Sequence, residues 1–207
     1  MGSIGPTKAS LQVGLVSPYT GSNLGDQAIH LACIEQLQIR CPGVAFTAIC
    51  LNPSAVALLH GVSAFPLSGL NVPFYTSRHL ADKREASLLR KTARAFKGRL
   101  VALRNALRWL MRAWRLMGTL DAVIVAGGGQ IDDEWGGAWG HPCSLLCWAM
   151  LSQLRGKRFL VLSVGFCKVG SARSRSFLRR ALNGAAYLSC RDEGSVAQTG
   201  EIGRAHV

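Results

Sequence analysis

Three short segments of the sequence combine glycine with charged or polar residues in a way that suits ligand binding. The first begins at Gly21 and contains Asn23, Gly25 and Asp26. Glycines between a strand and a helix let the backbone approach a ligand, and a helix N-terminus offers unpaired N–H groups to an anion. Asp26 is therefore a candidate catalytic carboxylate, and Asn23 and Gly25 are candidate binding residues. Capping of the helix by Asp26 is an equally good explanation.

The second segment holds three consecutive glycines, Gly127, Gly128 and Gly129, followed by Asp132 and Asp133. Three glycines strip a strand exit of side chains and leave N–H groups free to form an anion-binding nest. Their spacing differs from GxGxxG, so a dinucleotide fingerprint is not supported. We predict that the glycines bind substrate and that Asp132 is catalytic. For both aspartates, hydrogen bonds to sugar hydroxyls, acid–base work and a solvated loop edge remain open.

The third segment runs from Ser189 to Ser195 and contains Arg191 directly after an apolar run. An arginine just beyond a strand can form a two-pronged contact with a phosphate or a carboxylate. The acidic residues after it suit the first turn of a helix and alternatively only stabilise its dipole. We predict that Arg191 and Ser195 bind substrate, together with Ser163 and Gly165 at the end of the preceding strand.

The elements that must position these residues follow from apolar runs and their breaks. Strands are predicted at 11–16, 44–51, 120–126, 158–163 and 186–190. Helices are predicted at about 26–41, 52–61, 144–154 and 173–182, with a loop over 62–77 and a short last helix after residue 192. This alternation indicates an α/β fold, a Rossmann-like parallel sheet with helices on both faces. The exits of such strands share one rim, where ligands bind.

Positive charge is concentrated in one part of the chain. The formal net charge is +13, and the segment 78–115 has twelve Lys or Arg against two acidic residues. A long helical region is predicted at about 80–117. Its basic stripe consists of Arg104, Arg108, Arg112 and Arg115, and the apolar face beside it of Leu103, Leu107, Leu110, Met111 and Trp114. Two interpretations remain open: peripheral contact of 99–116 with an anionic membrane, or a core-packed helix with a solvated basic face. No motif indicates a specific nucleic-acid partner.

In their order along the chain, the motifs are similar to those of the polysaccharide pyruvyl transferase family. They are NLGDxAI from Asn23, DxVIxxGGG from Asp121, an S-x-G strand end, and S-x-RD-x-x-S from Ser189. The resemblance extends over 13–198 apart from the basic segment. Gln27 departs from the pattern, because many relatives have an acidic residue there.

The resemblance implies the N-terminal domain of a GT-B-like two-domain enzyme. Its reaction would transfer a pyruvyl group from phosphoenolpyruvate to sugar hydroxyls as a ketal, in exopolysaccharide or cell-envelope polysaccharide synthesis. Arg191 would help to hold phosphoenolpyruvate, the donor substrate, with residues of the second domain. The acceptor would be a glycan or a lipid-linked saccharide, and no cofactor and no metal are implied. A GT-B-like glycosyltransferase that uses a nucleotide-sugar and a non-catalytic interaction protein are the alternatives.

The domain organisation is predicted as follows. Residues 1–10 form a flexible N-terminus, 11–200 one Rossmann-like domain with a basic helical segment at 78–118, and 201–207 a non-native tail. The tail back-translates to GAGATCGGAAGAGCACACGTC, which contains the start of a common sequencing adapter. We therefore expect that the second domain is absent and that the fragment alone is inactive.

Seven cysteines lie mostly in apolar runs, and the sequence has no CxxC pair. This pattern predicts buried, reduced thiols rather than disulfides or a zinc site. Neither a signal peptide nor an apolar run long enough to span a membrane is visible. We expect a cytoplasmic protein, peripheral at the inner face of the membrane if the basic helix binds lipid.

Overall fold

The computed structural model describes residues 10–69 and 88–202. Its centre is a six-stranded sheet in the order β3-β2-β1-β4-β5-β6, and all neighbouring strands are parallel. The strands are β1 (Gln12–Val16), β2 (Ala45–Cys50), β3 (Ser63–Pro66), β4 (Ala122–Ile131), β5 (Arg158–Phe166) and β6 (Tyr187–Cys190). This is the strand order of a Rossmann fold, and it confirms the predicted α/β class.

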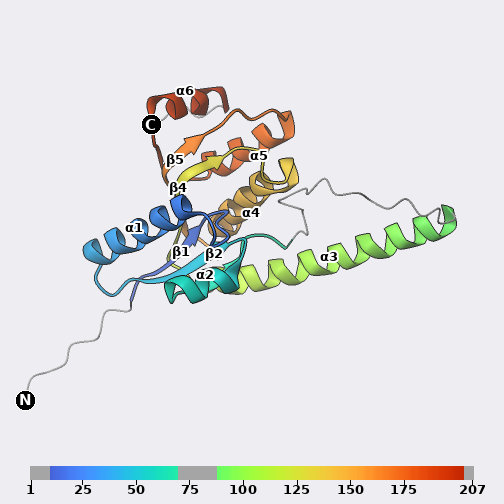
Figure 1. Cartoon of the computed structure of the whole chain (residues 1–207), viewed down its shortest axis with the longest axis horizontal. Helices are drawn as coiled ribbons and strands as arrows, with labels where there is room; N and C mark the ends of the chain where they lie inside the picture. The colour runs from blue at the N-terminus through green and yellow to red at the C-terminus, as the bar shows by residue number, and fades with distance from the viewer. Residues whose placement is uncertain (1–9, 70–87, 203–207) are drawn as a thin grey trace, which may run out of the picture.

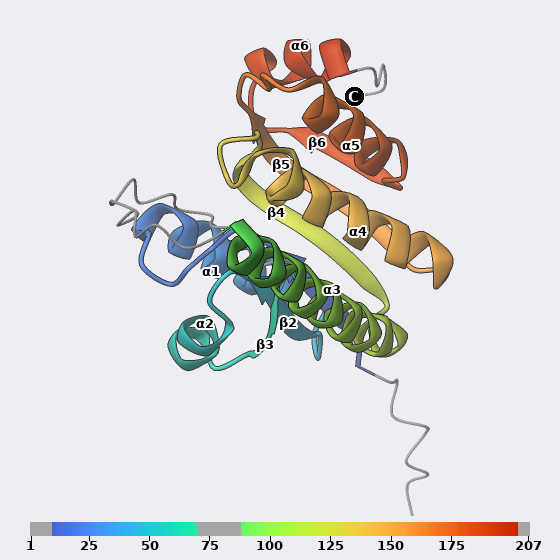
Figure 2. The same cartoon turned by 90° about the vertical axis from the view of Figure 1, so that its right-hand side faces the viewer.

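The connecting helices cover both faces of the sheet (Figure 1). They are α1 (Leu24–Arg40), α2 (Pro53–His60), α3 (Leu88–Thr119), the 3-10 turn η1 (Gly137–Trp139), α4 (His141–Leu154), α5 (Ala172–Asn183) and α6 (Glu193–Ile202). Crossovers between parallel strands are right-handed. Because the strand order grows in one direction from β1 and in the other from β4, α1 and α2 lie on one face and α3, α4 and α5 on the other. Figure 2 shows α3, α4 and α5 in front of the sheet.

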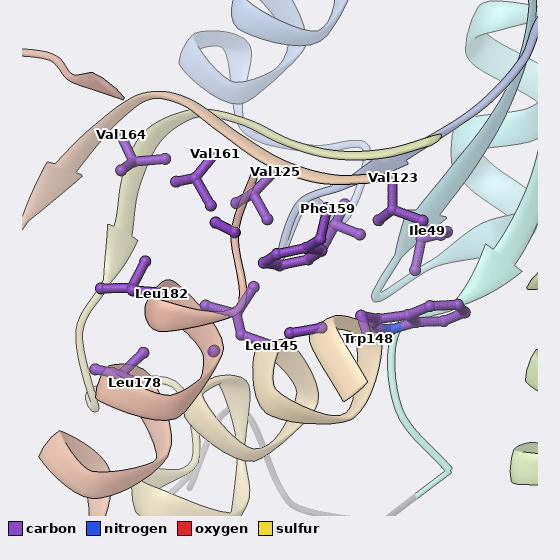
Figure 3. Close-up of a cluster of buried hydrophobic side chains, with 14 of the residues drawn as sticks. Ile49, Val123, Val125, Leu145, Trp148, Phe159, Val161, Val164, Leu178 and Leu182 are labelled. Atoms are coloured by element: carbon purple, nitrogen blue, oxygen red, sulfur yellow. The ribbon is translucent and has the colours of Figure 1, made fainter. Parts of the chain in front are cut away.

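The core consists of apolar layers on the two faces of the sheet. Along β4, Val123 and Val125 belong to the cluster that includes α3, α4 and α5, while Ile124 and Ala126 pack with residues of α1. This alternation is the two-residue period of a strand that is buried on both faces. Figure 3 shows the larger layer, in which Trp148 of α4 lies beside the strand side chains.

Two tryptophans anchor α3 and α4 to the end of β3. The indole Nε1 of Trp109 donates a hydrogen bond to the backbone oxygen of Pro66 (2.8 Å), and that of Trp148 donates to Leu67 (2.9 Å). The two rings meet edge to face, with centroids 5.5 Å apart. Residue 109 of α3 therefore lies level with the carboxyl end of β3.

The structure differs from three of the strand predictions by more than one residue. Ser63–Pro66, predicted as part of a loop over 62–77, is an edge strand, whose four residues give too short a pattern to recognise; residues 70–77 lie outside the described residues. β4 continues beyond 126 and β5 beyond 163. Both extend because Gly128 pairs with Val164 and Gly129 with Gly165, so the ladder runs through the glycines.

The cysteines differ in part from their prediction. All seven are free thiols, but only Cys50 is fully buried, and Cys167 is exposed. The prediction of buried thiols is therefore wrong for Cys167, which directly follows β5. This places a thiol at the edge of the sheet where the strands end.

Candidate functional site

The predicted binding segments meet at the carboxyl edge of the sheet. β1, β4, β5 and β6 are consecutive neighbours, so their exits lie side by side. Between β1 and β4 the chain changes direction across the sheet, because β1 leads to α1 on one face and β4 to α4 on the other. Such a switch point opens a crevice in which ligands of α/β proteins bind. The candidate site therefore extends along this edge from α1 to β6.

Asn23 begins α1 and caps it. Its Oδ1 accepts hydrogen bonds from the backbone N–H groups of Gly25 (2.9 Å) and Asp26 (3.5 Å). The interpretation that Asp26 is the cap is therefore wrong. The carboxylate of Asp26 accepts no hydrogen bond from the residues that the structure describes, and burial raises its pKa. Its side chain remains available for a ligand, while that of Asn23 has a structural task.

We expect Asn23→Ala to lower the free energy of unfolding by about 1 kcal/mol, because two N–H groups of the first turn lose their acceptor. Asp26→Asn, the matched change one turn later, is expected to alter it by less than about 0.5 kcal/mol. Urea unfolding followed by circular dichroism measures both values. A larger loss for Asp26→Asn than for Asn23→Ala would contradict this assignment of the cap.

The three glycines of β4 have different environments. Gly127 and Gly128 have positive φ angles of 42° and 76°, which glycine adopts without strain. A Cβ at Gly127 would lie 2.7 Å from Ile29 of α1, so close packing of the helix explains this glycine without a ligand. A Cβ at Gly128 would lie 3.9 Å from the Oδ1 of Asp26. Gly128 therefore lies beside Asp26, and the next residue of β4, Gly129, is exposed.

Asp132 and Asp133 lie just beyond β4 and differ in their surroundings. Asp132 is buried, and its Oδ1 accepts a hydrogen bond from the backbone N–H of Glu134 (3.1 Å). Burial raises the pKa of Asp132 to about 6. Asp133 accepts hydrogen bonds from the backbone N–H groups of Gly170 (3.3 Å) and Ser171 (3.0 Å), and these outweigh burial and lower its pKa. Asp133 thus holds the start of α5, whereas Asp132 is suited to carry a proton near neutral pH.

We expect Asp132→Asn to stabilise the fold at alkaline pH. A carboxyl group with a raised folded-state pKa is most favourable below its unfolded value of 3.8, and its contribution is lost as the pH rises through about 6. The free energy of unfolding of the variant minus that of the parent should therefore rise by about 2 kcal/mol between pH 4.5 and pH 8. Urea unfolding over this range measures the difference, in which the titration of other groups cancels. A constant difference would show that Asp132 has an ordinary pKa.

Arg191 lies against a glycine of the neighbouring strand. A Cβ at Gly165 of β5 would lie 2.9 Å from the Cζ of Arg191, so the guanidinium occupies the space above the glycine. The backbone N–H of Arg191 donates to the oxygen of Val164 (3.0 Å), and its Nε pairs with Asp192 Oδ2 (3.0 Å). The side chain is 58% exposed. Its guanidinium is held in place at the edge yet open to an anionic ligand.

The serines of this region mainly connect backbone segments. The Oγ of Ser195, a residue that is only 2% exposed, accepts a hydrogen bond from the N–H of Phe166 (3.0 Å). The Oγ of Ser189 accepts one from the N–H of Ser163 (2.9 Å), whose φ is 49°. Ser195 therefore supports the turn that carries Arg191, whereas Ser163 is exposed at the edge.

Two residues that the sequence analysis missed complete this part of the site. A Cβ at Gly129 would lie 4.0 Å from the Sγ of Cys167. Burial, followed by the carboxylates of Asp132 and Glu134, raises the pKa of Cys167, and the charge of Arg191 opposes this rise. The position of Cys167 directly after β5 was the available signal. Glu134 has no signal of its own beyond its acidic neighbours.

The sequence analysis also missed a cluster of three side-chain rings. The rings of Tyr19, His30 and His60 are mutual neighbours, with centroids 5.6 to 5.8 Å apart. Burial and then His60 lower the pKa of His30 to about 4, and burial followed by Asp26 raises the pKa of Tyr19. These residues come from the loop after β1, from α1 and from α2, and no sequence spacing indicates that they meet.

The edge can hold an anion and move protons. Arg191 supplies a cation, while Asp26 and Asp132 are carboxyl groups whose pKa values burial raises. Low-dielectric surroundings make such groups suitable as general acids or bases. In the part of the chain that the structure describes, no three His, Cys, Asp or Glu side chains gather as a metal site requires.

Comparison with known protein families gives a match over most of the chain. The family model described as "Polysaccharide pyruvyl transferase" matches residues 23–204, which is most of the chain. The match begins at Asn23, the cap of α1, and includes β4, β5, β6 and their exits. No curated protein matches the sequence.

Proposed function

Since the chain belongs to the polysaccharide pyruvyl transferase family, we propose that it binds phosphoenolpyruvate and transfers its pyruvyl group to a saccharide as a cyclic ketal. The acceptor is a glycan or a lipid-linked saccharide of exopolysaccharide or cell-envelope polysaccharide synthesis, and the reaction takes place in the cytoplasm. Catalysis also involves a second, GT-B-like domain, whose residues hold the donor together with Arg191.

The observation that carries the proposal is the position of Arg191 over Gly165. Phosphoenolpyruvate has a phosphate and a carboxylate, and a guanidinium can contact either with two parallel N–H donors. Because Gly165 has no side chain, the guanidinium of Arg191 can lie directly above it. The Arg191 side chain is also exposed, so a ligand at this edge of the sheet can reach it. Gly128 and Gly129 allow a ligand to lie close to the backbone beside Asp26.

The reaction needs a general acid and a general base. We assign the acid to Asp132, because a pKa of about 6 keeps part of this carboxyl protonated at neutral pH. It donates its proton to the methylene carbon of the donor, which becomes a methyl group. Asp26 accepts a proton from a sugar hydroxyl whose oxygen bonds to C2. The second hydroxyl then bonds to C2 as the phosphate leaves and takes the remaining proton.

Calorimetry with the 207-residue chain tests the donor. We expect it to bind phosphoenolpyruvate and not a UDP-sugar. Binding of the UDP-sugar alone would favour a nucleotide-sugar glycosyltransferase, and binding of neither would favour a non-catalytic interaction protein. Turnover is measured with phosphoenolpyruvate and a glycan acceptor, and the expected result is release of phosphate together with a ketal on the glycan.

A further inference from the structure

α3 has two adjoining apolar stripes. One packs into the core and contains the fully buried Ala113 and Met117. The other is open, and its side chains are between 39% and 57% exposed: Leu100, Leu103, Leu107, Leu110, Met111 and Trp114. At 3.6 residues per turn the open stripe is an arc of roughly 100° that directly adjoins the buried stripe. The apolar face predicted from the sequence is therefore this open one and does not belong to the core.

Arginines border the open stripe. Arg104, Arg108 and Arg115 follow one flank of it, and α3 contains no acidic residue. No carboxylate among the described residues pairs with these three arginines, because the ion pair found among those residues joins Arg191 and Asp192. Arg112 is different, because its guanidinium lies over the ring of Phe65 at 5.6 Å. The open stripe thus combines apolar side chains with cations that have no partner among the described residues.

The open stripe extends past the edge that holds the candidate site. α3 ends at Thr119, directly before β4, so it runs antiparallel to the strands. Trp109 lies level with the carboxyl end of β3, and every described side chain from 98 to 104 is exposed. The first part of the helix therefore stands beyond the carboxyl edge of the sheet, as Figure 1 shows.

We propose that α3 lies in the interface of an anionic lipid bilayer, with its open stripe in the acyl region and Arg104, Arg108 and Arg115 at the phosphates. Such a helix has a wide apolar face, a strongly basic flank and a tryptophan, and anionic lipids complement its charge. The helix does not cross the bilayer, since no described helix has the required length and apolarity. This contact would hold the carboxyl edge near lipid-linked molecules, whichever group the site transfers.

A second copy of the chain fits the same stripe less well. Leu100, Leu103, Leu107, Leu110 and Trp114 alternate steps of three and four residues, as a coiled-coil seam does. Each helix of such a pair would however carry nine Lys or Arg and no acidic residue. Repulsion between like charges opposes this pairing, whereas an anionic surface removes it.

Co-sedimentation of the chain with vesicles of phosphatidylcholine, alone or with 30% phosphatidylglycerol, tests the inference. We expect binding to the anionic vesicles that weakens with salt, and little binding to the neutral ones. The pair Arg104→Gln and Arg108→Gln should reduce the partition coefficient about 30-fold, because each of the two cations contributes a similar free energy to binding at the anionic surface. The matched pair Arg158→Gln and Arg180→Gln, both exposed elsewhere, should reduce it much less.

The apolar stripe is tested in the same assay. Leu103→Gln with Leu107→Gln should reduce binding at least about tenfold, since both side chains would enter the acyl region. Ile39→Gln with Leu58→Gln, at 70% and 89% exposed positions away from α3, should leave it unchanged. Equal binding to both vesicle types, or unchanged binding of both α3 pairs, overturns the proposal. A dimer in solution that the Leu103 and Leu107 changes dissociate, without vesicle binding, does so too.

Discussion

Arg191→Ala is expected to weaken phosphoenolpyruvate binding about 100-fold and to abolish pyruvyl transfer. The phosphate or carboxylate of the donor would lose charge-assisted hydrogen bonds, each of which contributes about 1.5–3 kcal/mol. Arg191→Lys should lose about tenfold, because an ammonium group keeps the charge but cannot make the two-pronged contact. Calorimetry measures the loss of donor affinity, and phosphate release in the presence of a glycan acceptor measures the loss of transfer.

The matched control is Arg180→Ala, which removes an exposed arginine in the last turn of α5 and the same unit of charge. It should leave donor affinity within about twofold of the parent, since exposed charges at this range are screened by salt. Equal losses in the two variants would mean that the donor responds to net charge only. Unchanged affinity of Arg191→Ala would remove this residue from the site.

Gly165→Ala is expected to produce most of the Arg191→Ala defect while the arginine is still present. The new methyl group would occupy the place of the guanidinium, 2.9 Å from its Cζ, so the side chain must move away. The fold should tolerate the change, because what has to move is the end of an exposed side chain. We expect a loss of donor affinity of more than about tenfold, with a change in unfolding free energy below about 1 kcal/mol.

The double variant of Gly165 and Arg191 separates this effect from general damage. If the glycine acts through the guanidinium, Gly165→Ala adds almost nothing once Arg191 is alanine, and the two losses are not additive. Gly170→Ala is the matched control, since a Cβ there would meet no atom within 4 Å. Additive losses in the double variant would show that the methyl group harms the site by another route.

The sheet was largely predictable because its strands are apolar runs and its helices have clear ends. β3 was missed since Ser63–Pro66 is a short edge strand, whose pairing with β2 no local pattern announces. The glycine triplet was recognised, but the packing of α1 against Gly127 was not. Whether Gly127 faces a ligand or Ile29 depends on how α1 packs on β4, and this is a tertiary property.

The site was predictable only where one strand exit carries its own chemistry. Arg191 and Asp132 can be recognised in the sequence by their type and position. Cys167 can be recognised only from charged groups that follow other strands of the sheet. The cluster of Tyr19, His30 and His60 consists of side chains from three separate segments of the chain and has no sequence signature. For α3 the sequence pattern predicts an amphipathic helix. It does not show which of the two apolar stripes packs into the core, because tertiary packing decides this.

The pairing of β1 with β4 has a consequence for how the chain acquires its structure. This pair forms the middle of the sheet, yet Val13 lies beside Ala122, and the N–H of Gln12 donates to a carboxylate oxygen of Asp121, 109 residues away. Contacts of such sequence separation require a large loop to close and slow folding. During synthesis β1, β2 and β3 must wait with one side of β1 unpaired until the whole of α3 has left the ribosome. We therefore expect the first third of the chain to be the part most dependent on chaperones.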